Sequence, residues 1–200
     1  MIADCEIDSL TVALSAVVHA ASRDKDRPSL SSVTLVFDQF KARAMATDGF
    51  WLAEYTFEPA KVEEPGKVSI PVSVAQKLLA MLDGEMGTVH VASDDGLVRF
   101  DIEKVGRVDC SPVANTPPFD EVWPKGDGKR LSRVGMNPKL LAKIGKAFGC
   151  EKGSGLFFTF FGENDPILIN VEGVAEMRAI LMPLRQLAIE FDGAEKESAA

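Results

Sequence analysis

The chain has 200 residues, 46% of them hydrophobic and 26% charged, and its formal net charge at pH 7 is −8. This length and composition predict a globular protein of one large or two small domains. The negative charge argues against a general nucleic-acid coat, which needs widespread cations, but it permits one basic face. No apolar run reaches the roughly 20 residues of a membrane helix, and the acidic start is unlike a signal peptide, so we expect a cytoplasmic protein.

Taken in order, the chain first shows a helix followed by strands. Apolar residues recur with helical spacing from Leu10 to Ala20. A charged stretch, residues 22–27, follows them. Strand-length apolar runs then cover residues 30–37, 41–46 and 51–57. Asp48-Gly49 between the last two is a turn signal, because glycine accepts positive φ and aspartate can bond nearby backbone. By itself this pattern is typical of an ordinary β-hairpin.

The same order returns twice more at a spacing of about 60 residues. The second unit has a strand at 68–71, a helix at 72–82 and strand-like runs at 88–92, 97–103 and 107–110. The third has a helix that begins after Asn137, a good N-cap, and strands at 156–161, 167–171 and 177–183. Recurrent order at fixed spacing predicts an α+β protein of βαβββ units, with helices on one face of antiparallel sheets. We expect a complete domain at 1–125, a third unit or half domain at 130–190, and a flexible tail at 191–200.

Several segments resemble the bacterial DNA polymerase III β sliding clamp family. Residues 46–53, Ala-Thr-Asp-Gly-Phe-Trp-Leu-Ala, are similar to the family's Ala-Thr-Asp-Gly-His-Arg-Leu-Ala. Residues 20–37, 68–71, 119–124, 135–141 and 180–185 resemble further family segments in the same order. The resemblance implies the DNA clamp fold, in which six units per chain close a ring of twelve around duplex DNA. Only three units occur here, and Phe50 and Trp51 replace the family's His-Arg, so we expect a shortened relative with an aromatic surface at this hairpin.

The resemblance also implies a pocket that captures peptides of a polymerase or other partners. Its expected lining consists of Leu30, Thr47, Gly49, Phe50, Trp51, Leu52, Pro124, Met182, Pro183, Leu184 and Arg185. An apolar concavity suits aromatic and aliphatic anchors of an extended peptide, while backbone groups and arginine orient it. The alternative is that Leu52, Met182 and Pro183 are ordinary core between units.

Basic residues on the helices are the candidates for contact with DNA. Lys139, Lys143 and Lys146 share one helix face, at i, i+4 and i+7. The remaining candidates are Arg23, Lys25, Arg27 and Lys77. If helices line a hole, these cations attract phosphate without regard to base sequence and in a salt-sensitive way. The alternative is the solvated face that any surface helix presents.

Nothing in the sequence indicates catalysis, a metal or a cofactor. His19 lies in an apolar helical run and is expected to be partly buried, whereas His90 lies in an alternating strand facing solvent or a hydrogen-bond partner. Cys5, Cys110 and Cys150 are odd in number and far apart, which predicts reduced structural thiols. We therefore predict a non-enzymatic sliding clamp-like protein. The alternative is a clamp-derived interaction or inhibitory module that closes no ring.

An unpaired third unit also has consequences for assembly. Its sheet is incomplete within the chain, and an exposed sheet edge with apolar surface is usually covered. The same unit of a second chain can cover it through a two-fold axis. We therefore expect a homo-oligomer with an even number of chains, a dimer or a tetramer.

Overall fold

The computed structural model describes residues 1–24, 26–131, 134–149 and 155–184. The first repeat consists of β1 (Ile2–Glu6), α1 (Ile7–Val18), β2 (Ser32–Phe37), β3 (Ala42–Thr47) and β4 (Trp51–Phe57). Strand β5 (Lys61–Glu64) precedes the second repeat, which consists of β6 (Gly66–Pro71), α2 (Val72–Leu82), β7 (Thr88–Asp94), β8 (Leu97–Ile102) and β9 (Gly106–Cys110). After a short 3₁₀ helix, η1 (Phe119–Glu121), the third repeat consists of α3 (Pro138–Ala147), β10 (Leu156–Thr159), β11 (Ile167–Val171) and β12 (Val174–Leu181).

The local sequence accounts for the ends of these elements. The Asn137 side chain caps α3 by accepting a hydrogen bond from the backbone N–H of Lys139 at 3.0 Å. In the turn between β3 and β4, Asp48 Oδ1 accepts hydrogen bonds from the backbone N–H groups of Phe50 and Trp51, at 3.0 and 3.2 Å. Gly49 has φ +90°, a conformation that favours glycine. The predicted turn is confirmed.

The sequence analysis placed no strand at β1 or β5, and several predicted ends differ from the structure. Helix α1 begins at Ile7 rather than Leu10, β10 ends at Thr159 rather than at residue 161, and β12 spans Val174–Leu181 rather than 177–183. Strand β5 is mostly charged, and its pattern alone does not indicate a strand. It forms because it pairs with β1, which is distant in sequence, and β1 in turn pairs with β7. Both strands form because of pairing partners that are distant in sequence, so local propensity could not predict them.

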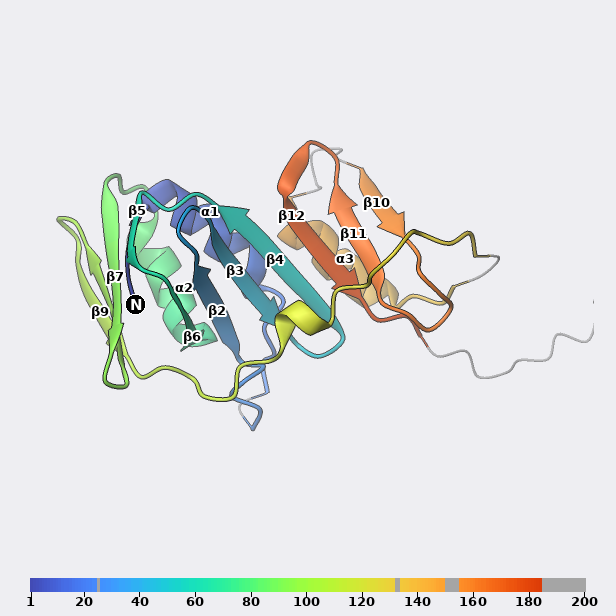
Figure 1. Ribbon diagram of the computed structural model, residues 1–200, viewed down its shortest axis with the longest axis horizontal. Coiled ribbons are helices and arrows are strands. Elements are labelled where there is room, and N and C mark those ends of the chain that lie inside the picture. Colours follow the sequence, from blue (N-terminus) through green and yellow to red (C-terminus); the bar gives the residue numbers. More distant parts are fainter. Residues whose placement is uncertain (25, 132–133, 150–154, 185–200) are drawn as a thin grey trace, which may run out of the picture.

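All strand pairs are antiparallel, and they form two sheets (Figure 1). The smaller sheet has the order β5-β1-β7-β8-β9, and the larger has the order β10-β11-β12-β4-β3-β2-β6. The third repeat thus extends the sheet of the first, with Trp51 opposite Leu181 and Tyr55 opposite Met177. In the third repeat, a bridge between Gly135 and Leu184 stands where the other repeats have their first strand.

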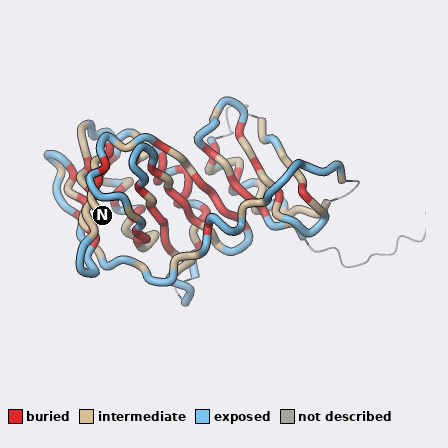
Figure 2. Tube along the Cα trace, viewed as in Figure 1, coloured by how far each residue is buried: buried red, intermediate tan, exposed pale blue. Residues whose placement is uncertain are grey.

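The helices and the connecting segment cover opposite faces of the larger sheet. Helix α1 packs on β3 and β4, with α2 and α3 on either side of it. The main core lies on this helix face, and Figure 2 shows the buried positions along the strands. Because successive strand residues point to opposite faces, Trp51 belongs to this core whereas Leu52 points away from it. The predicted α+β class, with helices on one face of antiparallel sheets, is confirmed.

A second, smaller core lies on the outer face of the larger sheet. It consists of Met45, Leu52, Phe119 and Ile180. Phe119 comes from η1, so its burial holds the connecting segment onto the sheet. Full burial of such a side chain contributes roughly 2 kcal/mol.

Beside this core, charged groups join β4 to β12. The carboxylate of Glu54 on β4 is only 2% exposed, and its Oε1 accepts a hydrogen bond from Nε of Arg178 on β12 at 2.7 Å. Nη2 of the same guanidinium lies 2.6 Å from Oε1 and completes the ion pair. Glu54 Oε2 lies 3.6 Å from Arg43 Nη1, and Arg43 in turn donates to Asp120 at 2.7 Å. The Trp123 ring covers Arg178, with 3.9 Å between guanidinium carbon and ring centroid. The buried carboxylate of Glu54 thus connects the first repeat to the third.

Removing Arg178 should therefore weaken the joint between these repeats. We expect Arg178→Ala to lower the free energy of unfolding by about 2 kcal/mol, because it leaves the buried Glu54 carboxylate with only the more distant Arg43. Urea unfolding followed by tryptophan fluorescence measures this change. Lys104→Ala, which removes an exposed partner of Glu103, should be nearly silent. Equal effects of the two substitutions would contradict the assignment.

Candidate functional site: an apolar pocket and a basic groove

The β3–β4 turn and the end of β12 together shape an apolar pocket on the outer face of the larger sheet. The backbone N–H of Met182 donates to the carbonyl of Phe50 at 2.9 Å, which continues the β4–β12 ladder to the turn. The side chain of Thr47 donates to the carbonyl of Trp51 at 2.7 Å and accepts from the N–H of Gly49 at 3.0 Å. These bonds fix the turn that forms one wall.

The cavity has a volume of about 200 Å³. Its lining is almost entirely apolar and consists of Leu30, Thr47, Gly49, Phe50, Trp51, Leu52, Pro117, Pro118, Phe119, Val122, Ile180 and Met182. The floor is the outer core, to which Leu52, Phe119 and Ile180 belong. At its mouth Phe50, 60% exposed, stands with the exposed side chains of Val122 and Met182. A small apolar hollow with exposed apolar side chains at its rim is suited to hydrophobic anchors.

Seven of the eleven residues predicted to line the pocket do so: Leu30, Thr47, Gly49, Phe50, Trp51, Leu52 and Met182. Pro183 and Leu184 do not, because the N–H of Leu184 donates to the carbonyl of Gly135 at 2.8 Å and the chain turns toward that residue. Pro124 lies beyond Trp123, which packs over Arg178 instead. Arg185 lies outside the described residues.

The predicted aromatic surface is only half present. Trp51 is 1% exposed and belongs to the helix-face core, so of these two aromatic residues of the hairpin Phe50 is the one exposed to solvent. The prediction overlooked strand alternation, which sends Trp51 and Leu52 to opposite faces. It also missed Pro117, Pro118, Phe119, Val122 and Ile180. Phe119 and Ile180 stand within segments that resemble the clamp family, so that resemblance was the signal available for them.

A second cavity, of about 400 Å³, lies on the helix side of the same turn. It forms where α1 ends, α2 begins and the second half of α3 passes. Its lining includes the cationic side chains of Arg23, Arg27, Lys143 and Lys146, with Asp48 as the one carboxylate among the lining residues. We call this cavity the basic groove. Phe50 lines both the groove and the apolar pocket, so the turn separates two cavities of opposite character.

The structure brings together four of the seven predicted DNA-facing residues. Arg23, Arg27, Lys143 and Lys146 line the basic groove. Lys139 and Lys77 are exposed but do not line it, since Lys139 sits in the first turn of α3 and Lys77 follows the groove residue Gln76 around α2. Lys25 lies outside the described residues. Spacing along one helix could not show that cations from two repeats meet in one groove.

His19 also lines the groove, and its side chain is exposed, whereas the sequence predicted a partly buried residue. Its partial burial, followed by the charges of Lys146 and Arg23, lowers its pKa below the ordinary value of 6.5. Burial is the larger cause of this lowered pKa, and the neighbouring cations of the groove add to it.

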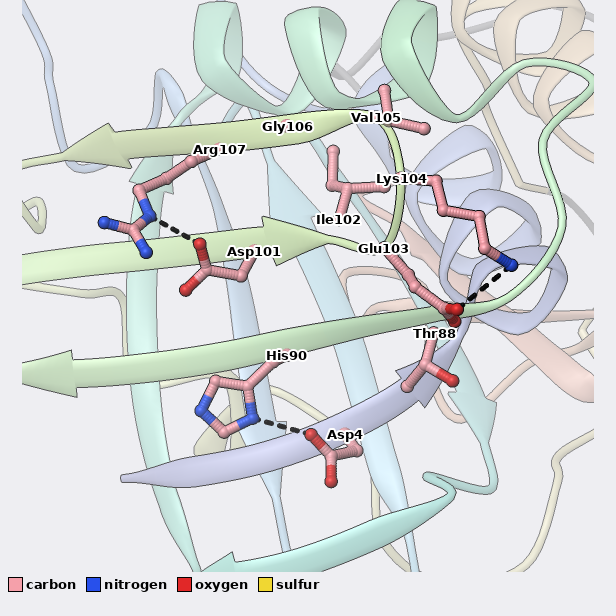
Figure 3. Close-up of a pocket in the computed structure, with 10 residues that line it drawn as sticks. All are labelled: Asp4, Thr88, His90, Asp101, Ile102, Glu103, Lys104, Val105, Gly106 and Arg107. Atoms are coloured by element: carbon pink, nitrogen blue, oxygen red, sulfur yellow. Dashed lines mark hydrogen bonds and ion pairs between the residues drawn. The ribbon is translucent and has the colours of Figure 1, made fainter.

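Elsewhere, ionisable groups are paired with one another. A hollow of about 820 Å³ on the outer face of the smaller sheet contains the pairs His90–Asp4, Arg107–Asp101 and Lys104–Glu103 (Figure 3). The bond from His90 Nδ1 to Asp4 confirms the expectation for His90. Within the described ranges, no three His, Cys, Asp or Glu side chains are grouped as a metal site would require.

The two cysteines that can be described have raised thiol pKa values. Burial, followed by Asp4 and Glu6, raises the pKa of Cys5 to about 12. Burial, followed by Asp109, raises that of Cys110. Such thiols are unreactive, in keeping with a structural role. In the part of the chain that the structure covers, no helix has the length and apolar character to cross a membrane.

The architecture is found in several solved proteins. A DNA polymerase sliding clamp from Bacillus subtilis has 17% sequence identity and a TM-score of 0.78, over 93% of this chain and 64% of that one. The DNA polymerase III beta subunit from Thermotoga maritima, at 17% identity, has a TM-score of 0.80 over 93% and 66%. The Pseudomonas aeruginosa clamp bound to griselimycin, at 15% identity, has a TM-score of 0.80 over 93% and 66%. The protein therefore has the DNA clamp fold, and it spans less than two-thirds of the length of these clamps.

The sequence family agrees with the fold. The family model of the DNA polymerase III beta subunit, central domain, matches residues 5–110, more than half of the chain. The chain belongs to this DNA polymerase III beta subunit family, as the resemblance implied. A comparison with curated proteins finds no match.

The basic groove makes a prediction for His19. Its titration midpoint should lie below 6.5, and Lys146→Ala should move the midpoint upward because one of the causes is removed. Since the unfolded chain then binds more protons than the folded one between the folded pKa and 6.5, this residue should reduce stability as pH falls through that window. NMR titration of the imidazole Hε1 resonance measures the midpoint. An unchanged midpoint in Lys146→Ala would contradict this account of the groove.

Proposed function

We propose that this protein acts as a sliding clamp-like factor that binds duplex DNA without sequence preference and tethers a polymerase or another partner through the apolar pocket. The role is non-enzymatic and cytoplasmic. One observation carries the proposal. In a chain of the DNA polymerase III beta subunit family, the Asp48-Gly49 turn of one repeat and Met182 after β12 of another build an apolar pocket.

The pocket supports the tethering part of the proposal through its shape and chemistry. Its volume of about 200 Å³ accommodates one or two apolar side chains rather than a whole cofactor. The exposed rings and aliphatic groups at the rim, Phe50, Val122 and Met182, extend the contact surface beyond the hollow. The related P. aeruginosa clamp is bound to griselimycin in its solved structure, so griselimycin is a suitable probe for this chain.

The basic groove supports the proposed binding of duplex DNA. Despite a net charge of −8, four cations converge on the helix face from the first and third repeats. Phosphate contacts of this kind provide affinity without reading bases. Lys77 and Lys139 are proposed as further contacts along the same helices, outside the groove.

Assembly is a third part of the proposal. Among the described strands, β10 pairs only with β11, and its Phe157 side chain is 57% exposed. We propose that the third repeat of a second chain covers this edge, so that two half domains complete each other. The proposed division at 1–125 and 130–190 leads to the same pairing.

The pocket is tested by truncation of its rim. We expect Met182→Ala to weaken griselimycin binding about tenfold, equivalent to about 1.4 kcal/mol, because a half-exposed apolar contact is lost without disturbing the core. Phe50→Ala should have a similar or larger effect. Isothermal titration calorimetry measures both.

Two matched variants control for these substitutions. Met86→Ala and Phe40→Ala truncate the same residue types at positions that are each 82% exposed and are not part of the pocket lining. Both should bind griselimycin as the unmodified protein does. If rim and control variants bind alike, the pocket is not the binding site.

The groove is tested by charge reversal. We expect Lys143→Glu with Lys146→Glu to reduce the magnitude of the salt slope for duplex DNA binding by about 2, roughly one for each lost phosphate contact. Fluorescence anisotropy at several salt concentrations measures the slope. DNA should also raise the pKa of His19, because phosphate favours its protonated form.

Lys61→Glu with Lys104→Glu makes the same change of net charge on the smaller sheet, away from the groove. This control should keep the slope. If both double variants reduced the salt slope equally, the net charge of the protein, and not the position of the lysines, would determine DNA binding. Griselimycin binding with no DNA retention at any salt would favour the alternative function, an interaction module that closes no ring.

A further inference from the structure

Strand β9 ends the second repeat as β4 ends the first and β12 the third. Strands β4 and β12 pair with each other, so both of their edges are occupied. Strand β9 pairs with β8, and no other strand of the described ranges lies on its second edge. Figure 1 shows β9 at one end of the molecule and β10 toward the opposite end. Among the strands that the structure describes, β9 is therefore the repeat-ending strand with a free edge.

The side chains of β9 alternate in a way that suits pairing with an identical strand. Arg107 and Asp109 are exposed on the outer face, while Val108, between them, is buried on the inner face. Strand β9 contains no proline and no lysine, the residues with which proteins commonly blunt an edge.

The outer face of the sheet already carries charges in alternating order. Figure 3 shows Asp4, His90, Asp101 and Arg107 in one row across four strands, and the registers place each directly opposite the next. In the neighbouring row, Arg99 lies opposite Asp109 and is bonded to it at 3.2 Å. The two rows thus end on β9 with opposite charges, Arg107 and Asp109.

We propose that two copies of this chain join through their β9 strands, antiparallel, with the two-fold axis at Val108. In this register Arg107 of each copy lies opposite Asp109 of the other, and Val108 opposite Val108. The row of one copy then continues as Asp101–Arg107–Asp109–Arg99, with strict alternation of charge across the joint. Opposite-charge pairs directly across strands stabilise the pairing.

Neighbouring registers are disfavoured by the same charges. An axis at Arg107 places the two Arg107 side chains opposite each other, and an axis at Asp109 does so for the two carboxylates. Like charges directly opposite destabilise a pair of strands. Pairing with the β10 edge instead would give Arg107 and Asp109 no additional ionic partner across the joint, because Leu156–Thr159 carries no charge. The partner that fits is therefore β9 of a second copy.

The β9 joint adds a second interface to the assembly proposed above. The joint itself does not depend on the proposed clamp function, but its role in closing a ring does. A chain of three repeats is a quarter of the twelve-repeat ring that the clamp resemblance implies. With one isologous joint at β9 and another at the third repeat, four chains close such a ring with two perpendicular two-fold axes in its plane. Either joint alone gives a dimer.

Charge reversal tests the β9 joint, with light scattering as the measurement. R107D alone and D109R alone place like charges opposite each other, and each should halve the mass from that of four chains to that of two. An equal mixture should recover the mass of four chains, because Asp at 107 and 109 of one variant then faces Arg at 109 and 107 of the other. Lys61→Asp, on the opposite edge of the same sheet, is the control and should keep the original mass.

Phe157→Asp separates this inference from the proposed function. It should break the joint of the third repeat and leave dimers joined at β9, and addition of R107D should give monomers. Dimers that separate with Phe157→Asp but not with R107D would overturn the β9 joint and leave the proposed function standing. Dimers that separate only with R107D would support the β9 joint and would contradict the proposal that the chains close a ring. A monomeric unmodified protein, or a mixture that regains no mass, would also overturn the joint.

Discussion

The structure depends on the antiparallel ladder between β4 and β12 and on the buried charge at its centre. Glu54 is almost fully enclosed, and such a carboxylate is stable only when cations and hydrogen-bond donors surround it. Arg178 supplies a hydrogen bond and an ion pair from the far strand, and Arg43 supplies positive charge from the near one. The carboxylate therefore favours one register of the seam, because a shift by a single residue would send Arg178 to the opposite face.

Both cavities follow from this seam. On the outer face it brings Met182 and Ile180 beside Leu52, and η1 then covers the remaining apolar surface with Phe119. On the helix face it brings α3 beside the end of α1, so that Lys143 and Lys146 join Arg23 and Arg27. Lys143 lies 3.6 Å from Asp48, the residue whose carboxylate organises the turn between the two cavities. A single connection of two repeats thus positions an apolar site and a cationic site back to back.

The repeat order, the class of fold and the turn could be predicted from the sequence because their signals are local. Asp48-Gly49 is a turn in almost any context, and the helical spacing of Leu10, Leu14 and Val17 specifies one buried face. Strand alternation sends Trp51 and Leu52 to opposite faces of the sheet. Which of the two residues faces the helices can be decided only when the face that the helices cover is known. Strand β5 and the enclosure of Phe119 depend on β1 and on the outer core, which are distant in sequence. The four cations of the basic groove were among the predicted DNA-facing residues, but their meeting in one groove could not be predicted, since they come from separate repeats.

The long separation of β4 and β12 along the chain has a consequence for the order of folding. Glu54 and Arg178 are 124 residues apart, so closing the seam carries a large loop entropy and belongs to the late steps. The first two repeats can pair β1 with β7 and β2 with β6 before residues beyond 174 have left the ribosome. Met182 joins the pocket only after that. A chain still in synthesis therefore has no complete pocket, and capture of a partner is confined to molecules that have finished folding.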